Sequence, residues 1–192
     1  MKILQGWRNQ GYHLNYGEEI IRQFVRREDC RPINRVLDMG CGKGRDLRLI
    51  RTELDSADLK LFGIGNTNID GVEINNIDLE CEHLPFPNET FDLTICNQVM
   101  EHLKNWLWAF QEQVRTTKVG GGVIVGFPNL AALHCRIQLL FGKQPSCIKI
   151  DSAHIRGFTH SEFVRVIDSI PGLTIIDFSG ANMYGVPPKI AH

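Results

Sequence analysis

The chain has 192 residues and a formal net charge of -1, and 43% of its residues are hydrophobic and 22% charged. This length suits one domain with a sizeable core, and the average composition argues against disorder. The near-zero net charge removes the electrostatic argument for binding nucleic acid or a membrane surface, and no stretch approaches the roughly 20 apolar residues of a membrane-spanning helix.

Hydrophobic periodicity divides the chain into alternating helices and strands. Apolar residues at helical spacing predict helices over 16–28, 45–54, 103–118, 129–141 and 159–169. Short apolar runs predict strands over 35–40, 59–65, 72–79, 91–98, 120–128 and 173–180. Strands that are almost entirely apolar and that alternate with helices indicate a mostly parallel sheet covered by helices on both faces. We therefore expect one α/β domain over 1–192, with an N-terminal helix at 16–28 and a core at 35–180.

The first strand runs into a glycine-rich turn in the stretch VLDMGCGKGRDL, from Val36 to Leu47. A phosphate-binding P-loop needs GxxxxGK[ST], but here Lys43 is followed by Gly44 and by no hydroxyl residue. The dinucleotide fingerprint needs GxGxxG, and GCGKGR places its third glycine one residue early. This spacing argues against a nucleotide phosphate loop and against a dinucleotide-dependent oxidoreductase.

Asp38 ends the strand, two positions before the first glycine. A negative charge at this place would repel a phosphate and attract a ligand that carries an ammonium or sulfonium group. The alternative is that Asp38 only accepts backbone N–H bonds that brace the turn. Cys41, within the turn, is expected to be a small packing residue.

Three motifs follow one another in order: VLDMGCGKG at the first strand, LPFPNETFDLTICNQVMEHL over 84–103, and GGGVIVGFPN over 120–129. Together they resemble the class I S-adenosylmethionine-dependent methyltransferases, particularly the small-molecule branch called type 11. The resemblance covers about residues 30–180. It implies a Rossmann-like, mostly parallel sheet between helices, and methyl transfer from S-adenosylmethionine to a small-molecule acceptor.

The resemblance also implies roles for individual residues. Asp38 and the backbone of residues 39–44 would hold the methionine part of the cofactor, and Asn97 would face the methyl-transfer site. Asp78 would bond the adenine amino group, with the Leu79 backbone N–H on the ring. For Asn97 the alternative is a capping role at the strand-to-helix turn. The residues expected to bind the cofactor are Asp38, Met39, Gly40, Cys41, Gly42, Gly44, Asn66, Asp78, Leu79 and Asn97.

The chain departs from the family at the end of the second strand. The family usually has an acid there that bonds both ribose hydroxyls, but this chain has Gly65 followed by Asn66. An amide can bond a hydroxyl without the strength of a charge-assisted bond. Asn66 is therefore the expected substitute, and a plain turn residue is the alternative; Asp70 and Glu73 are remoter candidates.

Two further departures concern the sheet. Only NTNIDG (66–71) separates the second and third strands, where a parallel crossover normally needs a dozen residues and a helix. Either the helix is deleted, which would open the adenosine side of the site, or the strand boundaries differ. At the chain end only LTIIDFSG (173–180) is visible of the usual closing hairpin. The sheet is therefore expected to lack its last edge strand, unless the sequence is a piece of a longer protein.

Methyl transfer from a sulfonium needs alignment and exclusion of water, and it needs a base only when the acceptor must lose a proton. His154 and Arg156 follow the fifth strand, in the region that commonly covers the substrate in this family, and are expected to bind the substrate. The catalytic residue stays unassigned, with His154 and His102 as candidates and a structural role as the alternative for each. His134 and His160 are further candidates.

The pair Glu101 and His102 also resembles the ubiquinone-pathway O-methyltransferases, in which a Glu-x-x-Glu-His array is associated with a divalent metal. Here Gln98 replaces the first acid, in the sequence QVMEH. Two ligands make a poor metal site, so no metal is expected, and His102 is expected to order the strand-to-helix turn.

The six cysteines are scattered, with no CxxC pair, and the N-terminus has no sustained apolar region typical of a signal peptide. A cytoplasmic protein with a small-molecule substrate is expected, without nucleic-acid or membrane partners. The apolar stripe over 129–145 is compatible with a core, a lid or a dimer surface, so a monomer and a homodimer both stay open. The competing functional class is a non-catalytic binding or regulatory module that retains the methyltransferase fold.

Overall fold

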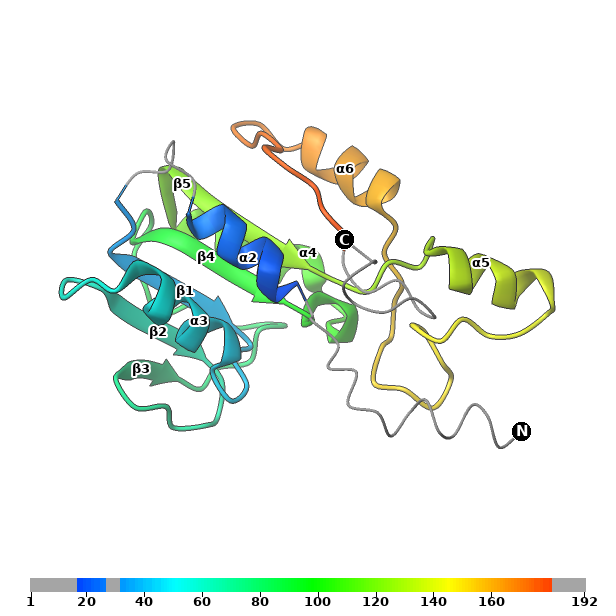
Figure 1. Cartoon of the computed structure of the whole chain (residues 1–192), viewed down its shortest axis with the longest axis horizontal. Coiled ribbons are helices and arrows are strands. Elements are labelled where there is room, and N and C mark those ends of the chain that lie inside the picture. Colours follow the sequence, from blue (N-terminus) through cyan, green and yellow to red (C-terminus); the bar gives the residue numbers. More distant parts are fainter. Residues whose placement is uncertain (1–16, 27–31, 181–192) are drawn as a thin grey trace.

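The computed structural model describes residues 17–26 and 32–180. A sheet of five strands forms its centre, in the order β3-β2-β1-β4-β5, and all neighbouring strands are parallel (Figure 1). The strands are β1 (Arg35–Met39), β2 (Lys60–Ile64), β3 (Val72–Asn75), β4 (Phe91–Asn97) and β5 (Thr117–Gly126). The expected Rossmann-like parallel sheet is confirmed.

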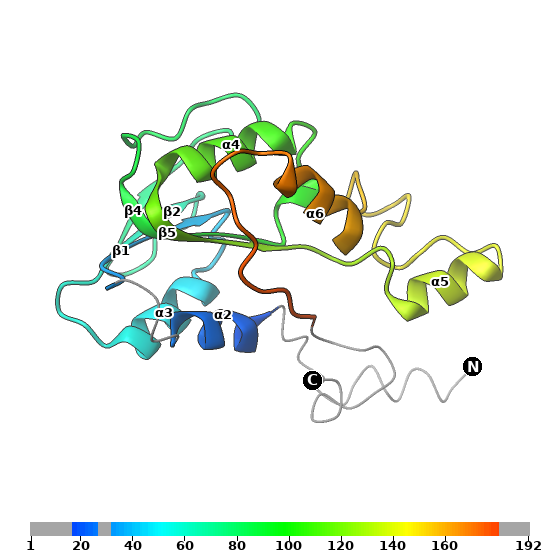
Figure 2. The same ribbon diagram turned by 90° about the horizontal axis from the view of Figure 1, so that it is seen from above.

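Helices cover both faces of this sheet, as Figure 2 shows. Helices α2 and α3 lie on one face, α4 and α6 lie on the other, and α5 lies beyond the end of β5. The helices are α2 (Glu18–Val25), α3 (Arg45–Leu54), the 3-10 helix η1 (Met100–His102), α4 (Trp106–Thr116), α5 (Leu133–Leu140) and α6 (His160–Asp168). No helix among these residues has both the length and the apolar character needed to cross a bilayer.

The central strand β1 supplies side chains to two separate cores. Leu37 and Met39 pack in the cluster that contains Phe110 of α4, whereas Val36 packs in the cluster that contains Leu47 of α3. Successive side chains of a strand point to opposite faces, so Asp38 shares the face of Val36. This alternation directs Asp38 toward the N-terminal end of α3, at the carboxyl edge of the sheet.

The connection between β2 and β3 is short and contains no helix, which confirms the deleted-helix interpretation. It occupies residues 65–71, and the strands that it joins are parallel. Arg51 of α3 donates hydrogen bonds to the carbonyl oxygens of Asp70 and Gly71, at 3.1 and 2.8 Å. Ile69 packs in the core on the same face. The loop therefore crosses the α3 face, where a crossover helix would otherwise lie.

Some predicted boundaries are wrong. Residues 173–180 form no strand, although their apolar run predicts one, and Ile176 and Phe178 are 60% and 53% exposed. The predicted helix at 129–141 begins only at Leu133, and β5 begins at Thr117, directly after α4. The Thr117 hydroxyl donates to the Gln113 carbonyl at 2.7 Å, which joins the two elements without a loop. Parts of the predicted N-terminal helix, and the chain end after residue 180, lie outside the described residues.

Candidate functional site

A cavity of about 240 Å³ opens at the carboxyl ends of β1 and β4. From β1 the chain continues to β2 on one side, while β4 pairs on the other side, so this is the point where the strand order reverses. Open parallel sheets bind ligands at this kind of switch point. The residues that line the cavity are Asp38, Gly40, Cys41, Arg45, Asp46, Asn97 and Gln98.

Three glycines shape the turn after β1, and each has a positive φ: 76° at Gly40, 51° at Gly42 and 75° at Gly44. A Cβ on Gly40 would lie 2.5 Å from Val99, and one on Gly44 would lie 2.7 Å from Ile69. A Cβ on Gly42 would meet nothing within 4 Å. Packing therefore demands the outer two glycines, whereas the middle one faces open space beside the cavity.

Asp38 is 3% exposed. Burial, and next the nearby carboxylate of Asp46, raise the pKa of Asp38 to about 8, against the opposing charge of Arg45. At neutral pH without a ligand the Asp38 carboxyl is therefore mostly protonated. A cationic group beside it would favour the ionised form, so the charge that the sequence assigns to Asp38 depends on its ligand.

Two residues that the sequence did not single out, Arg45 and Asp46, hold Asn97 in place. The Arg45 guanidinium donates to both oxygens of the buried Asp46 carboxylate, at 2.7 and 2.9 Å. The Asn97 amide donates to the same carboxylate at 3.0 Å. An acid in the first turn of a helix is ordinarily explained by the helix dipole, so the sequence carried no separate signal for this network.

Of the residues expected to bind the cofactor, Asp38, Gly40, Cys41 and Asn97 line the cavity. Cys41 is buried beside them, and burial raises the pKa of its thiol to about 11, in keeping with a packing residue. The other expected residues lie outside the cavity lining: Met39, Gly42, Gly44, Asn66, Asp78 and Leu79.

Those outlying residues differ in their surroundings. The Met39 side chain is fully buried in the core below α4. Asn66 and Asp78 are exposed, and the Asp78 carboxylate accepts the backbone N–H of Glu80 at 2.9 Å. Leu79 is half-buried against the same core as Met39. Asn66 and Asp78 thus lie at the surface, and their contacts with adenosine stay a prediction.

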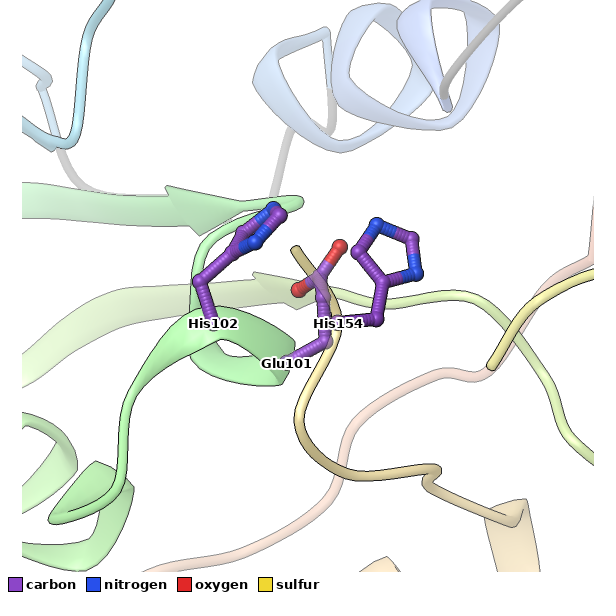
Figure 3. A group of neighbouring side chains, drawn as sticks. All are labelled: Glu101, His102 and His154. Carbon is purple, nitrogen blue, oxygen red and sulfur yellow. The ribbon is translucent and has the colours of Figure 1, made fainter. Parts of the chain in front are cut away.

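The segment over 153–156 packs against the turn after β4. Arg156 donates to the backbone oxygens of Leu103 and Lys104, at 3.0 and 2.6 Å, so it clamps this turn. His154 and His102 meet with their ring centres 4.7 Å apart, beside the buried Glu101 (Figure 3). The fold thereby brings His154 to the pair Glu101 and His102, which are neighbours in the sequence.

One known protein is similar to this chain in sequence over part of its length. The uncharacterized protein MJ0638 of Methanocaldococcus jannaschii is 32% identical over an aligned length of 134 residues, and the match covers 62% of this chain and 54% of that protein. The chain therefore spans about half the length of this relative.

Solved structures of low sequence identity share the fold. The YcgJ protein of Bacillus subtilis superposes with a TM-score of 0.56 at 19% identity, over 80% of this chain and 67% of that one. A SAM-dependent methyltransferase of Thermotoga maritima gives 0.54 at 19% identity, over 80% and 70%. The family model described as "Methionine biosynthesis protein MetW" matches residues 19–164. Since this match extends over most of the chain, the protein belongs to the MetW family, and its fold is that of the class I S-adenosylmethionine-dependent methyltransferases.

Proposed function

We propose that the protein transfers a methyl group from S-adenosylmethionine to a small-molecule acceptor. The observation that carries this proposal is the cavity at the carboxyl ends of β1 and β4, which Asp38 and Asn97 line together with Gly40 and Cys41 of the glycine turn. Its acidic side chains suit the ammonium group of the cofactor's methionine part, and the turn lacks the spacing of a phosphate loop.

The size of the cavity supports a divided binding mode. About 240 Å³ is below the roughly 300–1,000 Å³ of pockets that enclose a drug-sized ligand. The methionine part would lie in the cavity, while adenosine would lie over the open edge near Asn66 and Asp78. S-adenosylmethionine would supply the electrophilic methyl group; the protein would hold cofactor and acceptor in line and exclude water.

A second candidate function is a non-catalytic binding or regulatory module. The observation that favours it is the end of β2, where Gly65 stands at the place of the ribose acid and the neutral Asn66 that follows it is exposed. Such a module would bind the cofactor without transferring its methyl group. Tight binding together with methyl transfer to any acceptor in a panel of amines, carboxylates and hydroxyl compounds would eliminate this candidate.

Both candidate functions require that the protein binds the cofactor, and calorimetry with S-adenosylhomocysteine tests this binding. We expect binding to the parent protein and at least tenfold weaker binding to Asp38→Ala, since the carboxylate would bond the ammonium group. Asp58→Ala is the matched control, because Asp58 is an exposed acid that precedes β2 at the opposite edge of the sheet. No binding at millimolar concentration, or equal affinities in all three proteins, would contradict the proposal.

A further inference from the structure

Three side chains with metal-binding chemistry converge beside η1, as Figure 3 shows. Glu101 and His102 belong to η1, and His154 comes from the segment between α5 and α6. One donor atom from each residue lies within 4.8 Å of the other two. The motif QVMEH contains only two of these donors, and folding adds the third from a distant part of the chain.

Glu101 has an unusual position for a carboxylate. It is 1% exposed, and neither of its carboxylate oxygens has a hydrogen-bond partner among the described residues. A buried ionised carboxylate is costly unless a proton or a cation neutralises it. Burial raises the pKa of Glu101, while the neighbouring His102 and His154 oppose this change. The carboxylate is thus oriented toward two imidazoles and lacks a fixed partner of its own.

Both histidines are held in the orientation of metal ligands. The Nδ1 atom of His102 lies 3.0 Å from the carbonyl oxygen of Ala153, and Nδ1 of His154 lies 2.7 Å from that of Cys147. A carbonyl oxygen only accepts, so each Nδ1–H donates, and in the neutral imidazole the lone pair of Nε2 is then free to bind a metal. Metal-bound histidines typically donate their other ring N–H to a carbonyl or carboxylate in this way.

Backbone contacts hold the third ligand near the other two. The N–H of Ile155 donates to the carbonyl oxygen of Glu101 at 2.9 Å, and Arg156 clamps the residues that follow η1. Around a metal with bonds of about 2.0–2.1 Å, neighbouring donors are separated by roughly 3–3.5 Å. The donor atoms, which lie at most 4.8 Å apart, would therefore move closer together when a metal binds.

We propose that Glu101, His102 and His154 bind a divalent first-row transition metal such as Zn²⁺. Two imidazole nitrogens and one carboxylate suit Zn²⁺ or Fe²⁺, whereas Mg²⁺ and Ca²⁺ prefer oxygen ligands alone. Three protein ligands leave at least one coordination position for water or for an oxygen atom of a bound molecule. Metal binding at this site does not depend on the proposed methyl transfer.

The test is a titration of the untagged, metal-free, full-length protein with Zn²⁺ by calorimetry and with Co²⁺ by absorption spectroscopy. We expect one bound equivalent, a Co²⁺ spectrum without a thiolate charge-transfer band, and no comparable binding of Mg²⁺. Glu101→Gln and His154→Gln should each weaken binding at least tenfold. His160→Gln is the control, because His160 stacks on Phe178 and lies outside the cluster.

Several results would overturn the proposal. These are affinity weaker than millimolar for both metals, a thiolate band that places the metal on cysteine, or unchanged affinity in both cluster variants. Circular dichroism identifies any variant that fails to fold. His154 is only partly buried and lies in a loop, so His154→Gln decides the question if Glu101→Gln does not fold.

Discussion

The sulfur of Cys41 lies 3.1 Å from the position that a Cβ on Gly65 would occupy. The same sulfur would lie 2.7 Å from a Cβ on Gly63, within β2. Cys41 therefore fills the space above the end of β2, where the resemblance to methyltransferases places a ribose-binding acid. A side chain at position 65 and the Cys41 side chain would therefore compete for the same space, which explains why glycine stands where the family has an acid.

This arrangement predicts how an acid can be restored. Gly65→Asp alone crowds the Cys41 sulfur, whereas Gly65→Asp combined with Cys41→Ala gives the new side chain room. We expect the double variant to bind S-adenosylhomocysteine about tenfold more tightly than Cys41→Ala, because a carboxylate makes charge-assisted bonds to the ribose hydroxyls. Calorimetry over the four proteins of the double-mutant cycle measures the effect.

The uncharged Gly65→Asn, in the Cys41→Ala background, is the matched control for this experiment. It has nearly the shape of aspartate without the charge, so its gain should be clearly smaller. Equal affinities for the aspartate and asparagine variants would show that the side chain at this position does not reach the ribose.

The raised pKa of Asp38, about 8, predicts a pH-dependent affinity. The free protein holds a proton on Asp38 at neutral pH, and an ammonium-bearing ligand favours the ionised form, so binding releases a proton. Affinity for S-adenosylhomocysteine should therefore rise as pH increases toward about 8, by up to about tenfold per pH unit. Calorimetry in buffers of different ionisation enthalpy measures the released proton, and Asp38→Asn should release none at this site.

The raised pKa of Asp38 also predicts how the stability of the ligand-free protein changes with pH. A carboxyl group whose pKa rises from 3.8 to about 8 on folding favours the folded state at low pH, and this contribution is lost as pH rises through that interval. Denaturant unfolding of the ligand-free protein should therefore show a decline toward pH 8 that Asp38→Asn lacks. An identical pH profile for the two proteins would contradict the assignment.

The sheet and its glycine turn could be predicted from sequence because both depend on local chemistry. Strands that are buried on both faces need runs of apolar residues, as in β1 and β4. A turn with three positive φ angles needs glycines at those positions. Residues 173–180 show the limit of such reasoning, because their apolar run resembles a strand although no described strand pairs with it.

The side-chain clusters could not be predicted, because each depends on how distant segments pack. Asp46 contacts Asn97 only because α3 and the end of β4 meet at one edge of the sheet. His154 joins Glu101 only because residues after α5 return to η1. Spacing within one motif placed Glu101 beside His102, but it gave no signal for His154 or for the contact between Asp46 and Asn97.

Gly42 allows a test of the glycine turn that separates strain from binding. Valine at this position adopts a φ of 51° only at a cost of about 1–2 kcal/mol, and its side chain projects into open space beside the cavity. Gly172→Val is the matched control: its φ is 86°, and a Cβ there also meets nothing within 4 Å. We expect similar losses of thermal stability in both variants, but at least tenfold weaker S-adenosylhomocysteine binding only in Gly42→Val. Equal affinities would show that the bound ligand does not reach the space beside Gly42.

Two glutamate–arginine pairs, each three residues apart in a helix, predict effects of different size on stability. In α4 the Glu112 side chain is 6% exposed and lies 2.7 Å from Arg115. In α6 the Glu162 side chain is 66% exposed and lies 2.9 Å from Arg165. The hydrogen bond from Arg115, together with the backbone N–H of Leu84, lowers the pKa of Glu112 to about 2.

Glu112→Gln should therefore reduce the free energy of unfolding by about 3 kcal/mol at neutral pH, since the Arg115 guanidinium loses the carboxylate that balances its charge. Glu162→Gln should change it by less than about 0.5 kcal/mol, because water screens that pair. The Glu112 contribution is complete above its ordinary pKa of 4.5 and is lost as pH falls through about 2, so the two variants should converge in acid. Urea unfolding across this pH range measures both effects, and a constant difference between the variants would show that Glu112 acts through packing rather than through its charge.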